Sequence, residues 1–423
     1  MRKIFDYLQI EKNSKIVLFG FYTTIIFQLT TFKYIWHLEN LSRIINFICI
    51  LLFSGYAFYN LLKTRYNKKL YFYYIAPGLL IYIGYFLNIS LSLISDFNNL
   101  SQFGLLIPWA VYLAIPGLMK CNNINKYLLW KYFFNIMLFM TILSVSEYFL
   151  VFFGLTSLEE IKTPNGNFLA GFFSIFHQLE TGEVHQILYG PFMESGTLAM
   201  LLLPVMAYAF FMQKYVSLLI FSIGLILTNS LGGVMGLCML APFLIYFKFN
   251  LKRNIALILT SLLIMPLAIL FGNGLIERYQ EKNLSRETRE ISVLGFINVF
   301  PVLIVQYPLG MPLGDSHGGA DISKNYYGSN FTPGNAFYLG GVMAFFGYLA
   351  VLLISLKYAL SLCFCRVLSI EEKTVGASIF CLMPFIVQRE VIWDNGLFPF
   401  LFSPFIVLYI LNKNKNLDNF DDK

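Results

Sequence analysis

Charged residues are scarce in this sequence of 423 residues. Asp, Glu, Lys and Arg make up 13% of it, hydrophobic residues make up 57%, and the mean hydropathy is +0.66. Soluble domains usually carry about 25% charged residues, so this chain has too few to cover a surface that faces water. The composition excludes an ordinary soluble protein and indicates an integral membrane protein.

The sequence also lacks the patterns of several kinds of site. Its histidines form no HxxH or HxxxH pair, which argues against a metal site. No GxGxxG or P-loop signature occurs, so nothing supports ATP hydrolysis, and we expect no cofactor. The net charge of +7 comes from short basic clusters between hydrophobic runs, which is a signal of membrane topology rather than of nucleic-acid binding.

Long hydrophobic runs fill most of the chain. They lack the alternation of a membrane β-barrel, so we expect an all-α bundle, a single polytopic membrane domain over 1–423 with about 12 transmembrane helices. The runs are 16–36, 43–62, 71–95, 103–119, 127–155, 189–212, 215–230, 233–248, 255–272, 335–361, 374–389 and 396–411.

The basic residues predict the orientation of these spans. With the N-terminus inside, only nine of the 30 Lys and Arg residues fall on the outer side, which leaves 21 inside. Such an inner excess is typical of membrane proteins, so we expect both termini in the cytoplasm. The outer residues are Lys33, Arg43, Lys162, Arg278, Lys282, Arg286, Arg289, Lys324 and Arg389.

Two outer segments, 156–189 and 272–334, are longer than the turns of about 2–8 residues usual in helical bundles. The second lies between the ninth and tenth spans and contains the apolar stretch ISVLGFINVFPVLIVQ. Because Pro301 would break a spanning helix, we expect an amphipathic segment that lies along the membrane surface or dips into the bundle. Long loops on one face indicate that function lies on that face.

Glu194 stands at the start of the sixth span, in the run GPFMESGTLAMLLLPVMAYAF. Acidic residues at membrane depth are costly and are often functional, and burial would suit this one to accept a proton. The alternative is that Glu194 lies at the headgroup level and caps its own helix. The sequence favours the functional interpretation.

Charged residues also gather in two later segments. Arg278, Arg286 and Arg289 present guanidinium groups that match phosphate oxygens, although interleaved glutamates suit a solvated, salt-bridged face equally well. Arg389 and Glu390 lie between the last two spans. They either mark a span boundary or face the same cavity on the outer side as the other candidate residues.

Several motifs together resemble the bacterial O-antigen polymerase and O-antigen ligase superfamily. The runs PFMESGTLA, LTNSLGGVMGL, VQYPLGMPLG and GNAFYLGGVMAFFGYLA are similar to segments of this family. Ser195 and Leu231 depart from the proline and arginine of many members. Gly334 precedes Asn335 where the ligase branch typically has histidine, which favours a polymerase.

The resemblance implies a metal-independent glycosyltransferase in the bacterial inner membrane. It would transfer a growing glycan from undecaprenyl pyrophosphate to a lipid-linked repeat unit on the periplasmic face, in O-antigen or capsule synthesis, with a chain-length regulator as a candidate partner protein. Glu194 is the first candidate for the catalytic base and Glu390 the second. The alternatives are an O-antigen ligase and a flippase of lipid-linked oligosaccharides. Residues expected to bind pyrophosphate or glycan are Arg278, Arg286, Arg289, Arg389, Ser230 and Asn335.

Overall fold

The structure is a computed structural model of the whole chain. Most of the residues that the sequence analysis places in hydrophobic runs are among those it describes. The described residues are 15–63, 66–95, 103–120, 124–155, 158–163, 166–176, 184, 187–249, 296–311, 332–363, 365, 368–388 and 396–417.

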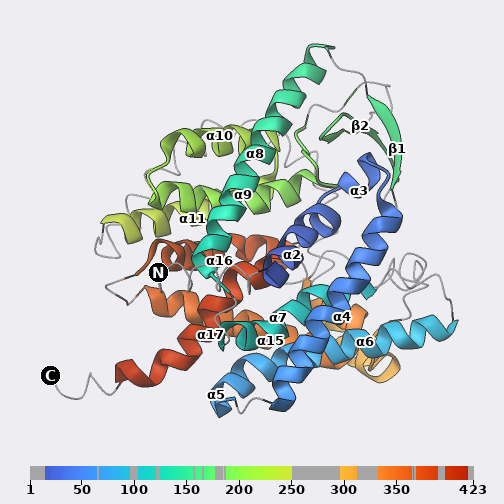
Figure 1. Cartoon of the computed structure of the whole chain (residues 1–423), viewed down its shortest axis with the longest axis vertical. Helices are drawn as coiled ribbons and strands as arrows, with labels where there is room; N and C mark the ends of the chain where they lie inside the picture. The colour runs from blue at the N-terminus through green and yellow to red at the C-terminus, as the bar shows by residue number, and fades with distance from the viewer. Residues whose placement is uncertain are drawn as a thin grey trace, which may run out of the picture.

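Helices dominate these residues (Figure 1), and every expected hydrophobic run is helical over most of its length except 255–272, which lies outside them. Two segments, η1 and η2, are π-helical. The first elements are α2 (Lys15–Thr23), η1 (Thr24–Leu29), α3 (Phe32–Ile35), α4 (Glu39–Lys63), α5 (Lys68–Leu70), η2 (Tyr71–Ile75), α6 (Ala76–Ser95), α7 (Ile107–Lys120) and α8 (Lys126–Phe152). The later helices are α9 (Ser195–Phe211), α10 (Tyr215–Leu227), α11 (Leu231–Phe249), α15 (Thr332–Leu362), α16 (Ile370–Gln388) and α17 (Leu397–Leu417), with a further helix at Phe296–Gln306.

Polar residues at the helix starts explain some of the boundaries. At α8, Asn125 Oδ1 accepts a hydrogen bond from the N–H of Leu128 (3.1 Å). At α16, the N–H of Ser369 donates to Glu372 Oε2 (2.8 Å) and the N–H of Glu372 donates to Ser369 Oγ (3.2 Å). This reciprocal pair is a capping box, which satisfies donors that the first turn of a helix leaves unpaired.

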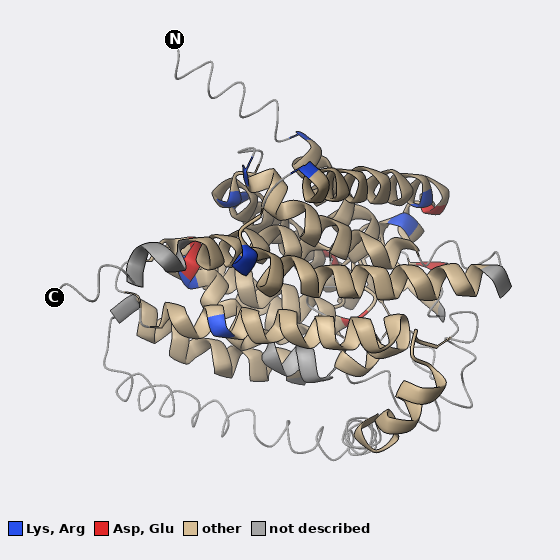
Figure 2. Cartoon of the chain, turned by 90° about the horizontal axis from the view of Figure 1, so that it is seen from below, with Lys and Arg blue, Asp and Glu red and all other residues tan. Residues whose placement is uncertain are grey.

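The chain is an all-α membrane protein. Within the described residues, 5 helices are long and apolar enough to cross a bilayer, and six shorter helices are apolar. Figure 2 shows that charged residues occupy only short stretches of the ribbon. Large apolar side chains such as Leu62, Phe72 and Leu219 are exposed on the surface of the bundle, as expected where helices face lipid.

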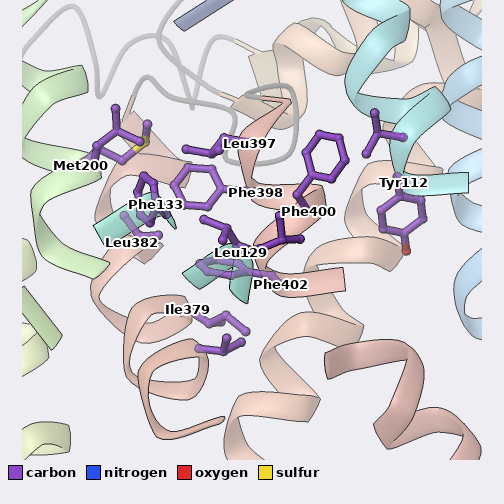
Figure 3. Close-up of a cluster of buried hydrophobic side chains, with 14 of the residues drawn as sticks. Tyr112, Leu129, Phe133, Met200, Ile379, Leu382, Leu397, Phe398, Phe400 and Phe402 are labelled. Carbon is purple, nitrogen blue, oxygen red and sulfur yellow. The ribbon is translucent and has the colours of Figure 1, made fainter. Parts of the chain in front are cut away.

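The core lies where α17 meets α7, α8, α9 and α16 (Figure 3). Phe398 and Phe402 of α17 are fully buried there, and Phe402 stacks on Trp130 of α8 with 6.1 Å between ring centroids. Met200 of α9 and Leu382 of α16 belong to the same cluster. Aromatic side chains bury a large area each, so this cluster holds helices from distant parts of the sequence together.

A small antiparallel sheet was not expected from the sequence, which predicted helices joined by loops. Strands β1 (Glu159–Thr163), β2 (Gly166–Ala170) and β3 (Ile175–Phe176) lie in the order β1-β2-β3, with Ile161 opposite Phe168. The strands are short and flanked by glycine, so their sequence signal is weak. They lie beside α3 in Figure 1, and the end of the bundle next to them is called the hairpin end below.

Pro301 does not break the helix that contains it. Phe296–Gln306 is helical throughout but is shorter than a membrane span, so the expectation that this stretch lies along the membrane surface or dips into the bundle stays a prediction. Phe296 and Leu303 are buried against Phe337 of α15, whereas Val305 is 80% exposed. Most of the exposed side chains of this helix are apolar, so its exposed face suits contact with lipid.

Candidate functional site

Glu194 is the residue immediately before α9, not a residue inside the helix as the sequence suggested. Its backbone is extended (φ −136°, ψ 140°), and its carbonyl accepts hydrogen bonds from the N–H groups of Thr197 (3.1 Å) and Leu198 (3.5 Å). Its side chain makes no capping hydrogen bond to the helix. Glu194 therefore occupies the N-cap position of α9 without a capping hydrogen bond from its carboxylate.

Tyr189 is a residue whose pKa responds to the charge of Glu194. Burial raises the pKa of the half-buried Tyr189 phenol above its ordinary value of 10.0, and the negative charge of Glu194 raises this pKa further. Tyr189 and Met193 also pack against the apolar cluster of the sheet, which includes Ile161 and Phe168. The carboxylate thus lies at the hairpin end, beside a phenol.

The chain leading to Glu194 is hydrogen-bonded to three other segments. The N–H of Leu188 donates to the carbonyl of Leu227 at the end of α10 (2.9 Å), and the N–H of Ile175 in β3 donates to the carbonyl of Gly190 (3.0 Å). The N–H of Thr31 donates to the carbonyl of Pro191 (2.8 Å). Glu194 follows these attachments by only a few residues, so they limit where it can lie.

Ser230 lies near the first turns of α9, in the turn between α10 and α11. Its Oγ accepts a hydrogen bond from the N–H of Gly233 (3.2 Å), so it caps the start of α11. A Cβ on Gly233 would lie 2.9 Å from the Cβ of Ala199, which shows how closely α11 and α9 approach. The structure therefore brings Ser230 to the same end of neighbouring helices as Glu194, with its hydroxyl oxygen engaged in capping.

Asn335 lies in the first turn of α15 and is half-buried. Helix α16 packs against both α15 and α9, so the helix that carries Asn335 and the helix that Glu194 precedes share a neighbour. Asn335 is therefore placed on a neighbouring part of the bundle rather than directly on the α9 junction.

The remaining predicted site residues lie outside the described residues. They are Arg278, Arg286, Arg289, Arg389 and Glu390. Gly396, which follows the segment with Arg389 and Glu390, lies against η1. A Cβ on Gly396 would lie 2.7 Å from Gln28 Oε1 and 3.3 Å from Thr24 Oγ1.

Sequence reasoning missed Glu147, a carboxylate on α8 that is only 7% exposed. Its Oε1 accepts a hydrogen bond from the N–H of Phe173 (3.1 Å), and its Oε2 accepts one from the N–H of Ser174 (2.5 Å). Both donors belong to the segment between β2 and β3. A signal existed in the sequence, because Glu147 is the one acid in the apolar run 127–155.

Sequence reasoning also missed a break in α15. Gly340 (φ −154°, ψ 20°) and Gly341 (φ 64°, ψ −157°) depart from helical geometry. The turn that contains Pro308 fills the gap, because the N–H of Met311 donates to the carbonyl of Tyr338 (2.9 Å) and the N–H of Val342 donates to the carbonyl of Pro308 (3.0 Å). The Pro–x–Gly turn of VQYPLG is thus fixed to α15.

Asn88 of α6 supplies the remaining donors at this break. Its Nδ2 donates to the carbonyls of Met311 (2.9 Å) and Leu339 (3.0 Å), with a longer contact to Tyr338 (3.3 Å). Asn88 is only 3% exposed. A broken helix inside a membrane protein requires such partners for its backbone groups, and here the protein itself provides them.

Comparison of the chain with protein-family models, with curated proteins and with solved structures finds no match. The fold and the described part of the site define the class as an all-α membrane protein.

Proposed function

We propose that the protein is a membrane glycosyltransferase that polymerises lipid-linked glycan repeat units. About 12 spans and the excess of basic residues in the segments assigned to the cytoplasm would place the hairpin end and 272–334 on the periplasmic face of a bacterial inner membrane. The four sequence motifs support a member of the polymerase and ligase superfamily, and Gly334 in the place of a histidine speaks against a ligase.

The reaction requires a base and a site for the leaving group. A hydroxyl of the acceptor repeat attacks the anomeric carbon of the donor glycan, and the bond from that carbon to the phosphate oxygen breaks. The hydroxyl proton passes to Glu194, and undecaprenyl pyrophosphate leaves with the electron pair. Arg278, Arg286 and Arg289 would stabilise the charge that develops on the pyrophosphate, without a metal ion.

The position of Glu194 carries the proposal. It directly precedes a buried helix, and Tyr189, whose phenol its charge affects, packs on the same apolar cluster as Met193. The chain before it is attached to β3, α10 and Thr31. A base has to be held within hydrogen-bond reach of the proton that it takes, and this local framework provides such a hold.

A flippase is the second candidate, because discontinuous helices are typical of transporters, and α15 is discontinuous at Gly340 and Gly341. In transporters the unwound carbonyls coordinate the transported ion or substrate. Here the carbonyls of Tyr338 and Leu339 already accept hydrogen bonds from Met311 and Asn88. The break is filled by protein groups, which favours the enzyme.

Transfer in lipid nanodiscs from a synthetic lipid-pyrophosphate-linked repeat unit tests the proposal. Glu194→Gln is expected to lower kcat by about 10²-fold or more, because general-base help is typically worth about 10²–10⁴-fold. Arg289→Ala is expected to lower it as well. Glu160→Gln, an exposed acid on β1, is the control and should leave the rate unchanged.

Full activity of both site variants, at normal protein levels, would refute the assignment. The surface-glycan pattern of a deletion strain separates the classes. Loss of a polymerase leaves one attached repeat without a ladder, loss of a ligase leaves no attached repeat, and loss of a flippase leaves repeat units on the inner face.

A further inference from the structure

Glu147 is an unusual residue for the interior of a membrane protein. Among the described residues no Lys, Arg or His forms an ion pair with it, and the hydrogen-bond donors to its carboxylate are backbone N–H groups. Burying a carboxylate is costly, and well-packed apolar residues often stabilise such a position as well or better. An acid here is therefore poorly explained by stability alone.

The hydrogen bonds of Glu147 fix a turn rather than a helix. The N–H groups of Phe173 and Ser174 both point to its carboxylate, and the turn closes through the N–H of Gly171 and the carbonyl of Ser174 (2.9 Å). A Cβ on Gly171 would collide with Glu147 Oε1. The carboxylate and the turn therefore fit together so closely that only glycine leaves room at position 171.

This turn is connected directly to the segment before Glu194. The residue after Ser174 is Ile175, whose N–H donates to the carbonyl of Gly190 (3.0 Å). Gly190 has a positive φ of 60°, and a Cβ there would lie 2.9 Å from Ser144 Oγ, one turn before Glu147 on α8. One face of α8 thus holds the turn at 171–174 and also lies against Gly190.

We infer that Glu147 is a positioning residue, which holds the 171–174 turn on α8 and through it sets the place of Glu194. This inference rests on the proposed function for the role of Glu194. Burying the carboxylate is costly, but it fixes the geometry of the turn, because charge-assisted hydrogen bonds are shorter and stronger than neutral ones. A displacement of about 1 Å in a catalytic group can lower the rate by about 10²-fold.

Two variants disturb this contact from opposite sides. Glu147→Gln keeps the size of the side chain, but it replaces one acceptor oxygen with an NH2 group that would face backbone N–H groups. Gly171→Ala keeps the glutamate at position 147, but its added Cβ displaces the Glu147 carboxylate. Glu160→Gln serves as the control, because it removes an exposed acid from the same part of the chain.

Hydrogen exchange measured in nanodiscs is the first readout. Both variants are expected to speed exchange by about tenfold or more in peptides covering 171–176 and also 187–194, because opening a local contact exposes the amides that it protects. The helices α15 and α16 should exchange as in the wild type. Unchanged exchange at 187–194 in both variants would overturn the inference, even if 171–176 is affected.

Transfer kinetics are the second readout. We expect kcat to fall by about 10- to 10²-fold, while the number of donor-binding sites per protein and KM stay within about twofold. A role in overall folding alone would instead reduce the number of binding sites. If exchange at 187–194 rises while Glu194→Gln remains fully active, the positional link stands and the proposed function fails. If Glu194→Gln is inactive and Glu147→Gln keeps the wild-type kcat, the positioning role is refuted.

Discussion

Replacing Asn88 with alanine removes the side chain that closes the break in α15. Its Nδ2 has two hydrogens, and its two shortest contacts are to the carbonyls of Met311 (2.9 Å) and Leu339 (3.0 Å). A hydrogen bond inside a membrane protein is worth about 0.6 kcal/mol on average, and a hydrogen bond in general is worth up to about 1.5 kcal/mol. Two lost bonds predict a decrease of about 1–3 kcal/mol in the free energy of unfolding.

Equilibrium unfolding in mixed micelles of rising SDS content measures this loss. Asn46→Ala is the matched control, because Asn46 of α4 makes only one long side-chain contact, to Ser42 Oγ at 3.5 Å. The control is expected to change the free energy of unfolding by less than about 0.5 kcal/mol, as is usual for substitutions that remove no strong interaction. Equal unfolding curves for the two variants would refute the reasoning that Asn88 satisfies the broken helix.

Two further predictions follow from described contacts. Gly341→Ala is expected to destabilise the protein more than Gly55→Ala. Gly341 has a φ of 64° and a Cβ there would collide with the carbonyl of Pro308, whereas Gly55 has open space around it. The SDS titration compares the free energies of unfolding of the two variants. Glu194→Gln is expected to lower the pKa of Tyr189, which stays above 10.0 because burial is the larger cause of its shift. Absorbance at 295 nm measures this pKa with Tyr189→Phe as reference, and an unchanged value would contradict the proximity. Since the folded-state pKa is raised, the stability that Tyr189 contributes is full below its ordinary pKa of about 10 and is lost as the pH rises through the higher folded-state pKa.

Hydrophobic runs predicted the helices well because membrane helices have to satisfy their own backbone hydrogen bonds. The run 127–155 became α8, and 374–389 became α16, which starts four residues earlier because Ser369 and Glu372 form a capping box. The short strands β1–β3 escaped prediction because they carry few residues and pair across a tight turn. Pro301 lies inside a helix that is packed on α15, but this helix is shorter than a membrane span.

The candidate site could be predicted only in part. Glu194 was found because an acid next to an apolar run is conspicuous, but its place one residue before α9 depends on local backbone geometry. Glu147 was overlooked because its partners are backbone N–H groups of Phe173 and Ser174, and sequence patterns do not show which backbone groups lack partners. The break in α15 had a signal in the pair Gly340–Gly341, yet its partner Asn88 lies about 250 positions away, as the contact to Tyr338 records.

The closing of the α15 break also sets how freely this part of the chain can change in length. Met311 is hydrogen-bonded to Tyr338 of α15, and α15 begins at Thr332, so both described ends of the connection between Met311 and Thr332 lie at the first part of α15. Because the two ends are already held together, the entropy lost on closing the connection grows slowly, by about 0.6 kcal/mol for each doubling of its length. Related chains can therefore lengthen or exchange the residues between these two points while the bundle keeps nearly the same free energy of folding.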